Sequence, residues 1–320
     1  MSAVVIATAF GGPEVLSVVD QPAGEPGPGQ ARIQVRAAGV NPVDWKQYSG
    51  RMGADPARLP LRLGAEAAGV VTAVGPGAVG PGAVGPAGPA RVGDEVIAFR
   101  APGAYATELV VPADALVPKP AALDWAPASG LMLTGVTAWH SLAATDVHQG
   151  DTVLMHGAAG GVGLTAIQLA VLRGATVIAT ASPSRHDAVR ELGAIPVGYG
   201  DGLEGRVRAA APGGVDVALD LVGTDEALDV SLDLVADRAR IATIVVTPRA
   251  REAGIKLLGG APGADPGTEI RLPARLDLAR LAGDGSLRVI VARTYPLTQV
   301  ADAHRASMAG HAPGKIILIP

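Results

Sequence analysis

The sequence predicts an α/β protein in which a doubly wound parallel sheet is joined to a second, β-rich module. From about residue 119, short apolar strands alternate with helices, which is the pattern of a parallel sheet covered on both faces. Before that point the chain consists of β-branched runs separated by Gly and Pro, which is typical of an antiparallel barrel or sandwich. A length of 320 residues suits two domains.

Composition excludes several classes of protein. The chain has no cysteine, which rules out disulfides, cysteine-ligated zinc, iron–sulfur clusters and a cysteine nucleophile. Its 26 basic and 30 acidic residues give a formal net charge of −4, a poor match for the phosphate backbone of a nucleic acid. No apolar run approaches the roughly 18 residues of a membrane helix, and the amino terminus lacks a basic leader. We therefore expect a soluble, cytoplasmic protein that acts on a small molecule.

The elements are expected in the following order. Residues 1–118 hold the first module, with strands at 4–8, 15–19, 31–37, 68–74, 95–99 and 107–111. Within it, the hexad GPGAVG occurs twice between residues 75 and 89, which predicts a flexible surface loop. Residues 119–262 hold the parallel sheet, with strands at 152–155, 175–181, 215–221 and 240–246 and helices from 161 and around 184–192 and 225–234.

The tail, residues 263–320, is expected to return to the first module. Its pattern predicts helix 276–282, strand 287–291, helix 300–308 and strand 315–319. The last strand ends at Pro320 and must find a partner in a sheet.

The most informative segment is GDTVLMHGAAGGVG at residues 150–163. An apolar strand runs into a turn with Gly157, Gly160, Gly161 and Gly163, and a helix follows directly. A pyrophosphate needs close access to backbone N–H groups at a helix N-terminus, where side chains would block it. Because a second strand and helix follow in order, we expect Ala159, Gly160, Gly161 and Val162 to bind a dinucleotide; the alternative is an ordinary tight turn.

The end of the second strand indicates which dinucleotide binds. NAD sites usually carry Asp or Glu there, whereas this chain has Ser182, Ser184 and Arg185. Hydroxyls and a guanidinium suit a 2′-phosphate, so the sequence favours NADPH. In the alternative interpretation the serines cap the next helix and Arg185 lies in solvent.

The chain as a whole resembles the zinc-free quinone oxidoreductase (zeta-crystallin-like) branch of the medium-chain dehydrogenase/reductase superfamily. Eight segments carry the resemblance: GVNPVDWK (39–46), LGAEAAGVV (63–71), VGDEV (92–96), GAYA (103–106), LTGVTA (133–138), AAGGVG (158–163), DLVG (220–223) and GHAPGKIIL (310–318). The resemblance implies a Rossmann NADPH-binding domain at 119–262 and a discontinuous GroES-like substrate domain at 1–118 and 263–320. It also implies a cleft for NADPH and a homodimer formed through Rossmann edge strands around 240–246 and 251–259.

The implied reaction is NADPH-dependent hydride transfer to a quinone or an activated C=C bond without zinc. Zinc-dependent relatives need cysteines that this chain lacks. The six histidines, His140, His148, His156, His186, His304 and His311, show no metal-binding spacing, and His156 is expected to pack near the cofactor. Hydride transfer without a metal needs mainly orientation and donors aimed at the oxygen that gains charge.

The resemblance implies an active site around residues 41–48. Asn41 matches the amide that lines the family's active site, although Asn before Pro42 also favours a turn. Trp45 and Tyr48 are expected to line the substrate pocket beside it. Lys46 is a candidate proton donor and Tyr48 a candidate catalytic residue; solvation and packing are their respective alternatives. Tyr105 is expected to pack in the barrel.

The remaining implied cofactor contacts lie from residue 134 onward. They are Thr134, Thr137, Tyr199, Gly223, Ile244, Val246 and Lys315. Thr134 and Thr137 would approach the nicotinamide ribose and amide, unless they only bridge a helical turn. Lys315 would reach the cofactor phosphates; its alternative is a lysine that guards a sheet edge.

Two other functions remain open at this point. The fold can bind NADPH in a non-redox tailoring or redox-sensing protein, because fold does not fix chemistry. A purely structural, crystallin-like role is the third possibility. Oxidation of NADPH over a panel of quinones and enones separates the three.

Overall fold

The computed structural model describes residues 1–78, 90–310 and 312–320. Most of the GPGAVG repeat and His311 lie outside the described residues. The chain forms two compact units, Met1–Leu133 with Leu276–Pro320, and Thr134–Arg275. Both boundaries fall later than residues 118 and 262, because each lies within a helix that the sequence pattern did not delimit.

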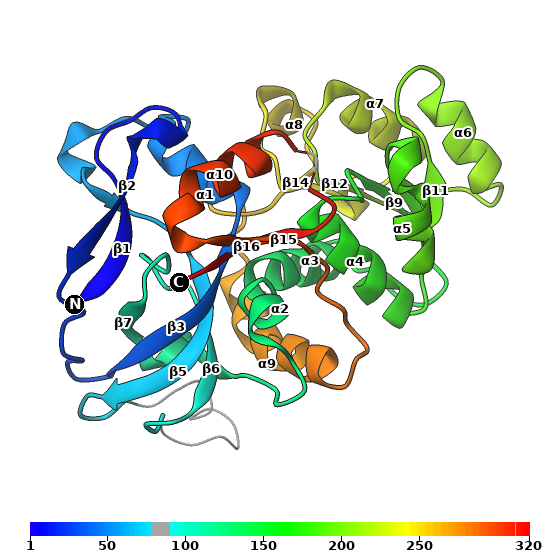
Figure 1. Cartoon of the computed structure of the whole chain (residues 1–320). Coiled ribbons are helices and arrows are strands. Elements are labelled where there is room, and N and C mark those ends of the chain that lie inside the picture. The colour runs from blue at the N-terminus through cyan, green and yellow to red at the C-terminus, as the bar shows by residue number, and fades with distance from the viewer. Residues whose placement is uncertain (79–89, 311) are drawn as a thin grey trace. The chain divides into compact units, whose positions relative to one another are not determined.

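The first unit is built on a seven-stranded sheet with the order β15-β16-β3-β5-β6-β8, where β7 also pairs with β3 (Figure 1). A smaller sheet has the order β2-β1-β4. The amino-terminal strands are β1 (Ser2–Ala7), β2 (Leu16–Gln21), β3 (Gln30–Val40), β4 (Leu61–Arg62), β5 (Glu66–Val74), β6 (Glu95–Phe99), β7 (Glu108–Pro112) and β8 (Leu116–Pro118). Ile33, Leu63 and Ile97 are fully buried in this unit. The β-branched runs therefore form the antiparallel layer that their spacing predicts.

The tail joins this sheet. Strand β16 (Lys315–Ile319) pairs with β3 on one side and with β15 (Val291–Pro296) on the other. Lys315 is therefore not at a sheet edge, and that alternative for it is wrong. The strand expected at 287–291 begins instead at Val291, because Leu287 is buried in the turn after the helix Thr268–Gly283 and its N–H donates to the Leu281 carbonyl.

Five helices belong to the first unit or cross its boundary: α1 (Pro42–Tyr48), α2 (Trp125–Ser129), α3 (Met132–Ala144), α9 (Thr268–Gly283) and α10 (Val300–Met308). Residues 42–48 are a helix, although Asn41 before Pro42 favours a turn. Pro42 stands at the start of α1, where a missing N–H costs nothing, and the Asp44 carboxylate accepts the Asn41 N–H at 2.8 Å.

The second unit is a six-stranded parallel sheet with the order β11-β10-β9-β12-β13-β14. The strands are β9 (Thr152–His156), β10 (Thr176–Thr180), β11 (Ile195–Val197), β12 (Val217–Asp220), β13 (Ile241–Thr243) and β14 (Lys256–Leu257). The connecting helices are α4 (Gly161–Leu172), α5 (His186–Glu191), α6 (Leu203–Ala210), α7 (Asp225–Leu234) and α8 (Pro248–Glu252). Because the chain runs outward from β9 in one direction and then in the other, right-handed crossovers place the helices on both faces.

No helix among residues 1–78, 90–310 and 312–320 combines the length and apolar character needed to cross a lipid bilayer.

Candidate active site and cofactor-binding turn

The second unit has its topological switch point between β9 and β12. These strands are neighbours in the sheet, and His156 at the end of β9 is in register with Asp220 at the end of β12. In open α/β sheets, ligands bind beyond the carboxyl ends of the strands at this point. The glycine turn follows directly after His156, so it lies at the position where a ligand is expected.

Three glycines of the turn differ in what requires them. Gly157 has a positive φ of 69°, which disfavours other residues. A Cβ on Gly163 would lie 2.4 Å from the Ala158 carbonyl oxygen, so the helix can approach the strand only without a side chain. A Cβ on Gly160 would meet nothing closer than the Gly157 oxygen at 3.4 Å, which is ordinary contact. The fold itself therefore does not need glycine at 160, whereas a ligand approaching the backbone does.

Thr180, at the end of β10, fixes this turn from the neighbouring strand. Its side-chain oxygen accepts the Gly157 N–H at 3.2 Å and its carbonyl accepts the Ala158 N–H at 3.1 Å. The role of Thr180 could not be predicted from the sequence, because a threonine that ends a strand carries no local signal of such a bond.

The residues after β10 form a short 3-10 turn, Pro183–Arg185. The hydroxyls of Ser182 and Ser184 are 3.2 Å apart, and neither Ser182 before this turn nor Arg185 before α5 makes a side-chain capping bond. The helix-capping alternative for Ser182 is therefore wrong. Ser184 is exposed, and Ser182 and Arg185 are half-buried. Two hydroxyls and a guanidinium thus gather within four residues beyond the second strand of the sheet.

Asp220, at the end of β12, binds the segments that follow β12 and β13 beside the switch point. Its Oδ1 accepts the N–H groups of Val222 and Gly223 at 3.0 and 2.7 Å, and its Oδ2 accepts the Thr243 hydroxyl at 2.9 Å. Thr243 Oγ1 in turn accepts the Val245 N–H at 3.0 Å. This buried carboxylate therefore shapes both segments that carry the expected contacts Gly223, Ile244 and Val246. Asp220 belongs to the DLVG segment that resembles the family, but no pattern in the sequence predicted that its carboxylate would make these bonds.

The other expected cofactor residues occupy two places in the second unit. Thr134 and Thr137 are nearly buried on α3. Tyr199 is 61% exposed in the loop after β11, where Arg206 of α6 donates to the carbonyls of Gly198, Gly200 and Asp201 at 2.9, 2.7 and 2.7 Å. Arg206 therefore binds the backbone of the loop that carries the exposed Tyr199 ring.

In the first unit, Asn41 belongs to a buried polar cluster with Glu66 and Lys315. Glu66 Oε1 accepts the Asn41 amide at 2.9 Å and the Lys315 ammonium at 2.8 Å. Lys315 also donates to Asn41 Oδ1 and, at 3.3 Å, to the Val40 carbonyl. The second hydrogen of the Asn41 amide points to the Gly39 carbonyl at 3.3 Å. The side-chain donors of Asn41 and Lys315 are thus engaged by protein groups, which favours positioning over direct contact with a ligand.

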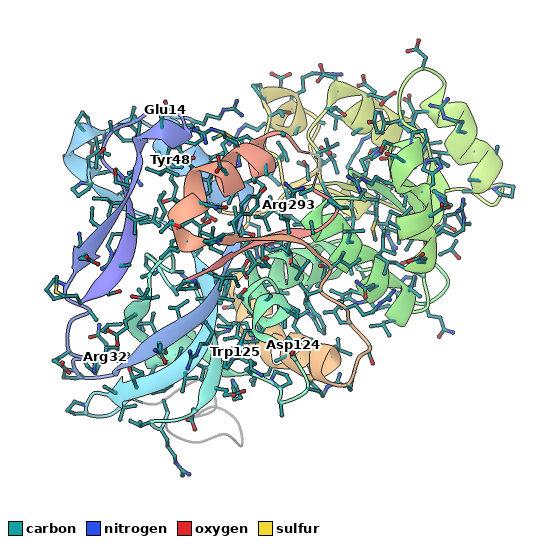
Figure 2. The ribbon with its side chains drawn as sticks, viewed as in Figure 1. Glu14, Arg32, Tyr48, Asp124, Trp125 and Arg293 are labelled. Carbon is teal, nitrogen blue, oxygen red and sulfur yellow. The ribbon has the colours of Figure 1, made fainter. Side chains whose placement is uncertain are left out.

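Tyr48 lies in the core of the first unit rather than on a pocket wall. Its side chain, which is labelled in Figure 2, is fully buried. The Tyr48 hydroxyl is hydrogen bonded to His304 Nδ1 of α10 at 2.8 Å. Tyr105, also fully buried as expected for a packing residue, donates to Asp44 at 2.6 Å and lies 3.4 Å from His304 Nε2. This chain of bonds fastens α1 to α10.

Burial governs the titration of this chain of bonds. It raises the pKa of Asp44 to about 6, against the hydrogen bond from Tyr105, and lowers the pKa of His304 to about 4. Burial also raises the pKa of Tyr48 and Tyr105. Both tyrosines are therefore neutral at physiological pH.

Trp45 and Lys46 are the half-buried members of the expected site. Two cations lie near the Trp45 ring, with Lys46 Nζ 5.7 Å and the Arg51 guanidinium carbon 5.1 Å from its centroid. Within the described residues the buried Trp45 Nε1 has no hydrogen-bond partner. Of the four residues expected around 41–48, these two remain accessible.

Comparison with known proteins identifies the family. Residues 27–121 match the model of the alcohol dehydrogenase GroES-like domain, and residues 192–318 match that of a zinc-binding dehydrogenase. A quinone oxidoreductase of Pseudomonas aeruginosa is 32% identical over 329 residues, covering 98% of each chain. The chain belongs to the quinone oxidoreductase branch of the medium-chain dehydrogenase/reductase superfamily.

Two further relatives span the whole chain. A 2-haloacrylate reductase of a Burkholderia species is 33% identical, covering 97% of this chain and 96% of its own. The Escherichia coli quinone oxidoreductase solved in complex with NADPH is 28% identical, covers 100% of both chains and has a TM-score of 0.84. The two units described above are therefore the GroES-like and Rossmann domains of this family.

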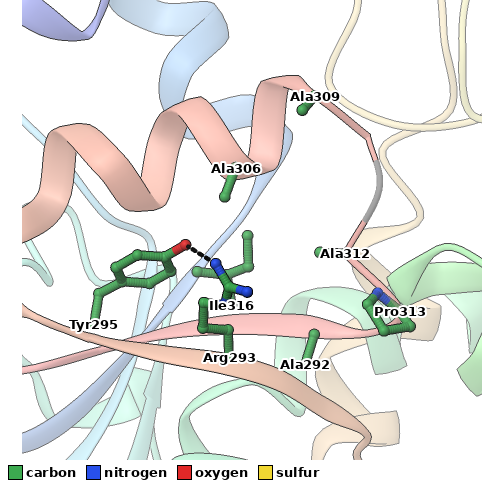
Figure 3. Close-up of a pocket in the computed structure, with 8 residues that line it drawn as sticks. All are labelled: Ala292, Arg293, Tyr295, Ala306, Ala309, Ala312, Pro313 and Ile316. Carbon is green, nitrogen blue, oxygen red and sulfur yellow. Dashed lines mark hydrogen bonds between the residues drawn. The ribbon is translucent and has the colours of Figure 1, made fainter.

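The GroES-like domain also contains a pocket of about 200 Å³ that Asn41, Glu66 and Lys315 do not line (Figure 3). It is lined by Ala292, Arg293, Tyr295, Ala306, Ala309, Ala312, Pro313 and Ile316, and its polar contact is the Arg293 guanidinium donating to the Tyr295 hydroxyl at 3.1 Å. Ile316 and Lys315 are consecutive on β16, so their side chains leave opposite faces of the sheet. This pocket is thus separate from the Asn41 cluster.

His156 provides a test of the burial at the switch point. Its Nε2 is buried without a hydrogen-bond partner in the described part of the chain, and burial lowers its pKa to about 4. The unfolded chain therefore takes up a proton between pH 6.5 and 4 that the native state refuses, so stability falls as pH falls through this window. Between pH 7.5 and 5, the free energy of unfolding of His156→Leu should therefore fall by about 2 kcal/mol less than that of the wild type.

The measurement is urea unfolding of both proteins at the two pH values. Asp44, whose raised pKa acts in the opposite direction, is common to both proteins and cancels in the difference. Equal losses on acidification in the two proteins would show that His156 is not buried neutral.

Proposed function

We propose that this protein is an NADPH-dependent reductase that transfers a hydride to a quinone or an activated C=C bond without zinc. The observation that carries the proposal is the turn at the switch point, where Gly160 leaves space that the fold itself does not use. Full-length similarity to a quinone oxidoreductase, a 2-haloacrylate reductase and a structure complexed with NADPH supports it.

The residues present fit NADPH. The backbone of Ala159, Gly160, Gly161 and Val162 would hold the pyrophosphate at the N-terminus of α4. Ser182, Ser184 and Arg185 would hold the 2′-phosphate through charge-assisted hydrogen bonds. Gly223, Ile244, Val246, Thr134 and Thr137 would border the nicotinamide end, and Tyr199 the adenosine end. When bound, NADPH supplies a hydride, and reduction of a quinone to its hydroquinone takes up one proton besides.

The chain's own part in the reaction is orientation and proton supply. Asn41 keeps its place through Glu66 and Lys315, while Trp45 offers an aromatic face for a flat substrate. Lys46, beside that ring, is the proposed proton donor, with solvent as the alternative source. Tyr48 holds α1 in place through its bond to His304 and would not contact the substrate itself.

Zinc independence rests on the chemistry of the donor groups. The chain has no thiolate, and the Lys315 ammonium already supplies the positive charge beside Glu66 and Asn41. A divalent cation at this cluster would be repelled by the ammonium. We propose that orientation replaces electrophilic catalysis by a metal.

Cofactor choice is tested by Arg185→Glu. A carboxylate at this position repels a 2′-phosphate, so KM for NADPH should rise by about a hundredfold while KM for NADH changes less than about threefold. The matched control is Arg190→Glu on α5, an exposed arginine paired with Asp187. Steady-state kinetics with both cofactors decides, and equal effects of Arg185→Glu on the two would remove the assignment of the 2′-phosphate.

The substrate class is tested with nicotinamide-labelled deuterated NADPH. Reduction of an enone would place the deuterium on the β-carbon of the product, which mass spectrometry detects. Reduction of quinones alone would give a hydroquinone and leave enones unchanged. Each outcome selects one of the two proposed substrate classes.

We further propose a cytoplasmic homodimer. NADPH is regenerated inside cells, which places a reductase that consumes it there. The sequence suggested edge strands around 240–246 and 251–259, but β13 at 241–243 is an interior strand paired on both sides. Strand β14, Lys256–Leu257, is the last strand of the sheet and remains as the proposed pairing surface, although its Leu257 carbonyl accepts the Asp265 N–H at 2.8 Å. Sedimentation equilibrium of the wild type and of Leu257→Pro tests this interface, since a dimer that persists in the variant excludes it.

A further inference from the structure

The GroES-like domain contains an ion pair that is buried unusually completely. Glu66 has no exposed side-chain surface and Lys315 only 5%, and their charged atoms are 2.8 Å apart. Two glycines make room for the pair. A Cβ on Gly39 would lie 2.6 Å from Glu66 Oε1, and one on Gly130 would lie 3.1 Å from the Lys315 side chain. The surrounding backbone is therefore shaped around these two side chains.

Stability alone does not account for such a pair. Desolvating two charges costs about as much as their attraction returns, so neutral side chains of similar volume are often equally stable. A loss of one partner alone is far more costly, because the other charge is left buried. The role of the Glu66–Lys315 pair therefore lies in the groups that it holds in place.

Glu66 and Lys315 connect three segments that the proposed function uses. Glu66 begins β5, Lys315 begins β16, and both bind Asn41 at the end of β3, the strand that lies between them in the sheet. The other oxygen of Glu66 accepts the Leu133 N–H at 2.9 Å, in the first turn of α3. A carboxylate is favoured there by the free N–H groups and dipole of the helix. Thr134 is the next residue of that helix.

We propose that Glu66 and Lys315 are a positioning pair that holds the Asn41 side chain and the first turn of α3 in one arrangement, and this rests on the proposed function. Glu66 bridges Asn41 to α3 through its two oxygens. Lys315 balances the charge and orients the Asn41 carbonyl oxygen. Neither residue touches substrate or cofactor in this role.

The test uses the full chain with a neutral double variant, Glu66→Gln with Lys315→Met. It keeps roughly the volume of the pair and removes both charges, so we expect it to lose far less stability than a variant that leaves one of the charges buried alone. The glutamine amide of this variant has one oxygen, so it cannot accept from both Asn41 and Leu133 as the Glu66 carboxylate does. We therefore expect kcat to fall by about tenfold or more, with KM for the quinone changed by less than about threefold.

A matched control comes from the same sheet. The Lys119 side chain is also nearly buried and pairs at 3.0 Å with Glu95, whose side chain is 49% exposed. Lys119 contacts the Pro120 and Leu123 carbonyls and the Trp125 ring instead of the expected site. Glu95→Gln with Lys119→Met should leave kcat within about twofold of the wild type. A normal kcat in the Glu66 and Lys315 double variant overturns the proposal.

A second variant and a second readout cover the remaining outcomes. Glu66→Asp keeps both charges but shortens the bridge, so it should fold even if the double variant does not; a wild-type kcat in Glu66→Asp also overturns the proposal. In the cofactor-free protein, hydrogen exchange at the Leu133 amide should quicken by about tenfold in the double variant and not in the control. Unchanged hydrogen exchange at Leu133 would contradict the positioning role, even if the wild type reduced no substrate. A wild type that reduced no substrate would instead count against the proposed function.

Discussion

Replacing Gly160 with valine is expected to abolish tight binding of NADPH while leaving the fold intact. Gly160 has φ −81° and ψ 170°, a conformation that valine adopts readily, and its Cβ would meet only ordinary contact. The added side chain would instead fill the space beyond the turn that the pyrophosphate needs. Kd for NADPH should rise by about a hundredfold, equivalent to nearly 3 kcal/mol. Fluorescence titration measures it, alongside the thermal midpoint without cofactor.

Gly163→Val is the matched control for this experiment. Its Cβ would lie 2.4 Å from the Ala158 carbonyl oxygen, within the protein itself. This variant should therefore lose stability even without cofactor, by several kcal/mol, as overpacked sites do. If Gly160→Val also unfolded the protein, or bound NADPH normally, the turn would not be a ligand cradle.

The second large effect is expected at Asp220. Asp220→Ala would leave the N–H groups of Val222 and Gly223 and the Thr243 hydroxyl without their acceptor. Hydrogen bonds to a charged group contribute about 1.5–3 kcal/mol each, and because the bond from Thr243 is buried while those from Val222 and Gly223 are only partly buried, we expect a loss of about 3 kcal/mol. The segments at Gly223 and at Ile244–Val246 would then lose their shape together. Urea unfolding and NADPH titration should both report the change.

Thr243→Val separates the two segments. It removes the bond from Thr243 to Asp220 and the bond that Val245 donates, but leaves Val222 and Gly223 held. Its loss of stability should be less than half that of Asp220→Ala. Equal losses in the two variants would place the effect in Thr243 rather than in the bridge made by Asp220.

The sequence was sufficient to predict features that repeat along the chain. The glycine turn after β9 and the strand–helix alternation that follows it have local patterns, and they form the Rossmann domain as predicted. The error at 287–291 has a local cause, because an apolar run of that length does not show whether its first residue pairs in a strand or packs from the turn after a helix, as Leu287 does after α9. The helix at Pro42 was missed because Asn-Pro was interpreted as a turn.

Features made by tertiary contact could not be predicted in this way. Glu66, 25 residues from Asn41, and Lys315, 249 residues from Glu66, meet only because β16 and β5 flank β3. Tyr48 and Trp45 share a short helix, yet one is buried against His304 and the other is partly accessible. The helical periodicity of this segment had to be known before its two aromatic residues could be assigned to different faces.

The most direct test of the central proposal is oxidation of NADPH at 340 nm by the purified chain over a panel of quinones and enones, corrected for the uncatalysed rate. The proposal predicts saturable turnover with at least one member, dependence on NADPH rather than NADH, and no loss of rate after treatment with a metal chelator. Tight NADPH binding without turnover of any member would contradict it and favour a non-redox role for the same fold.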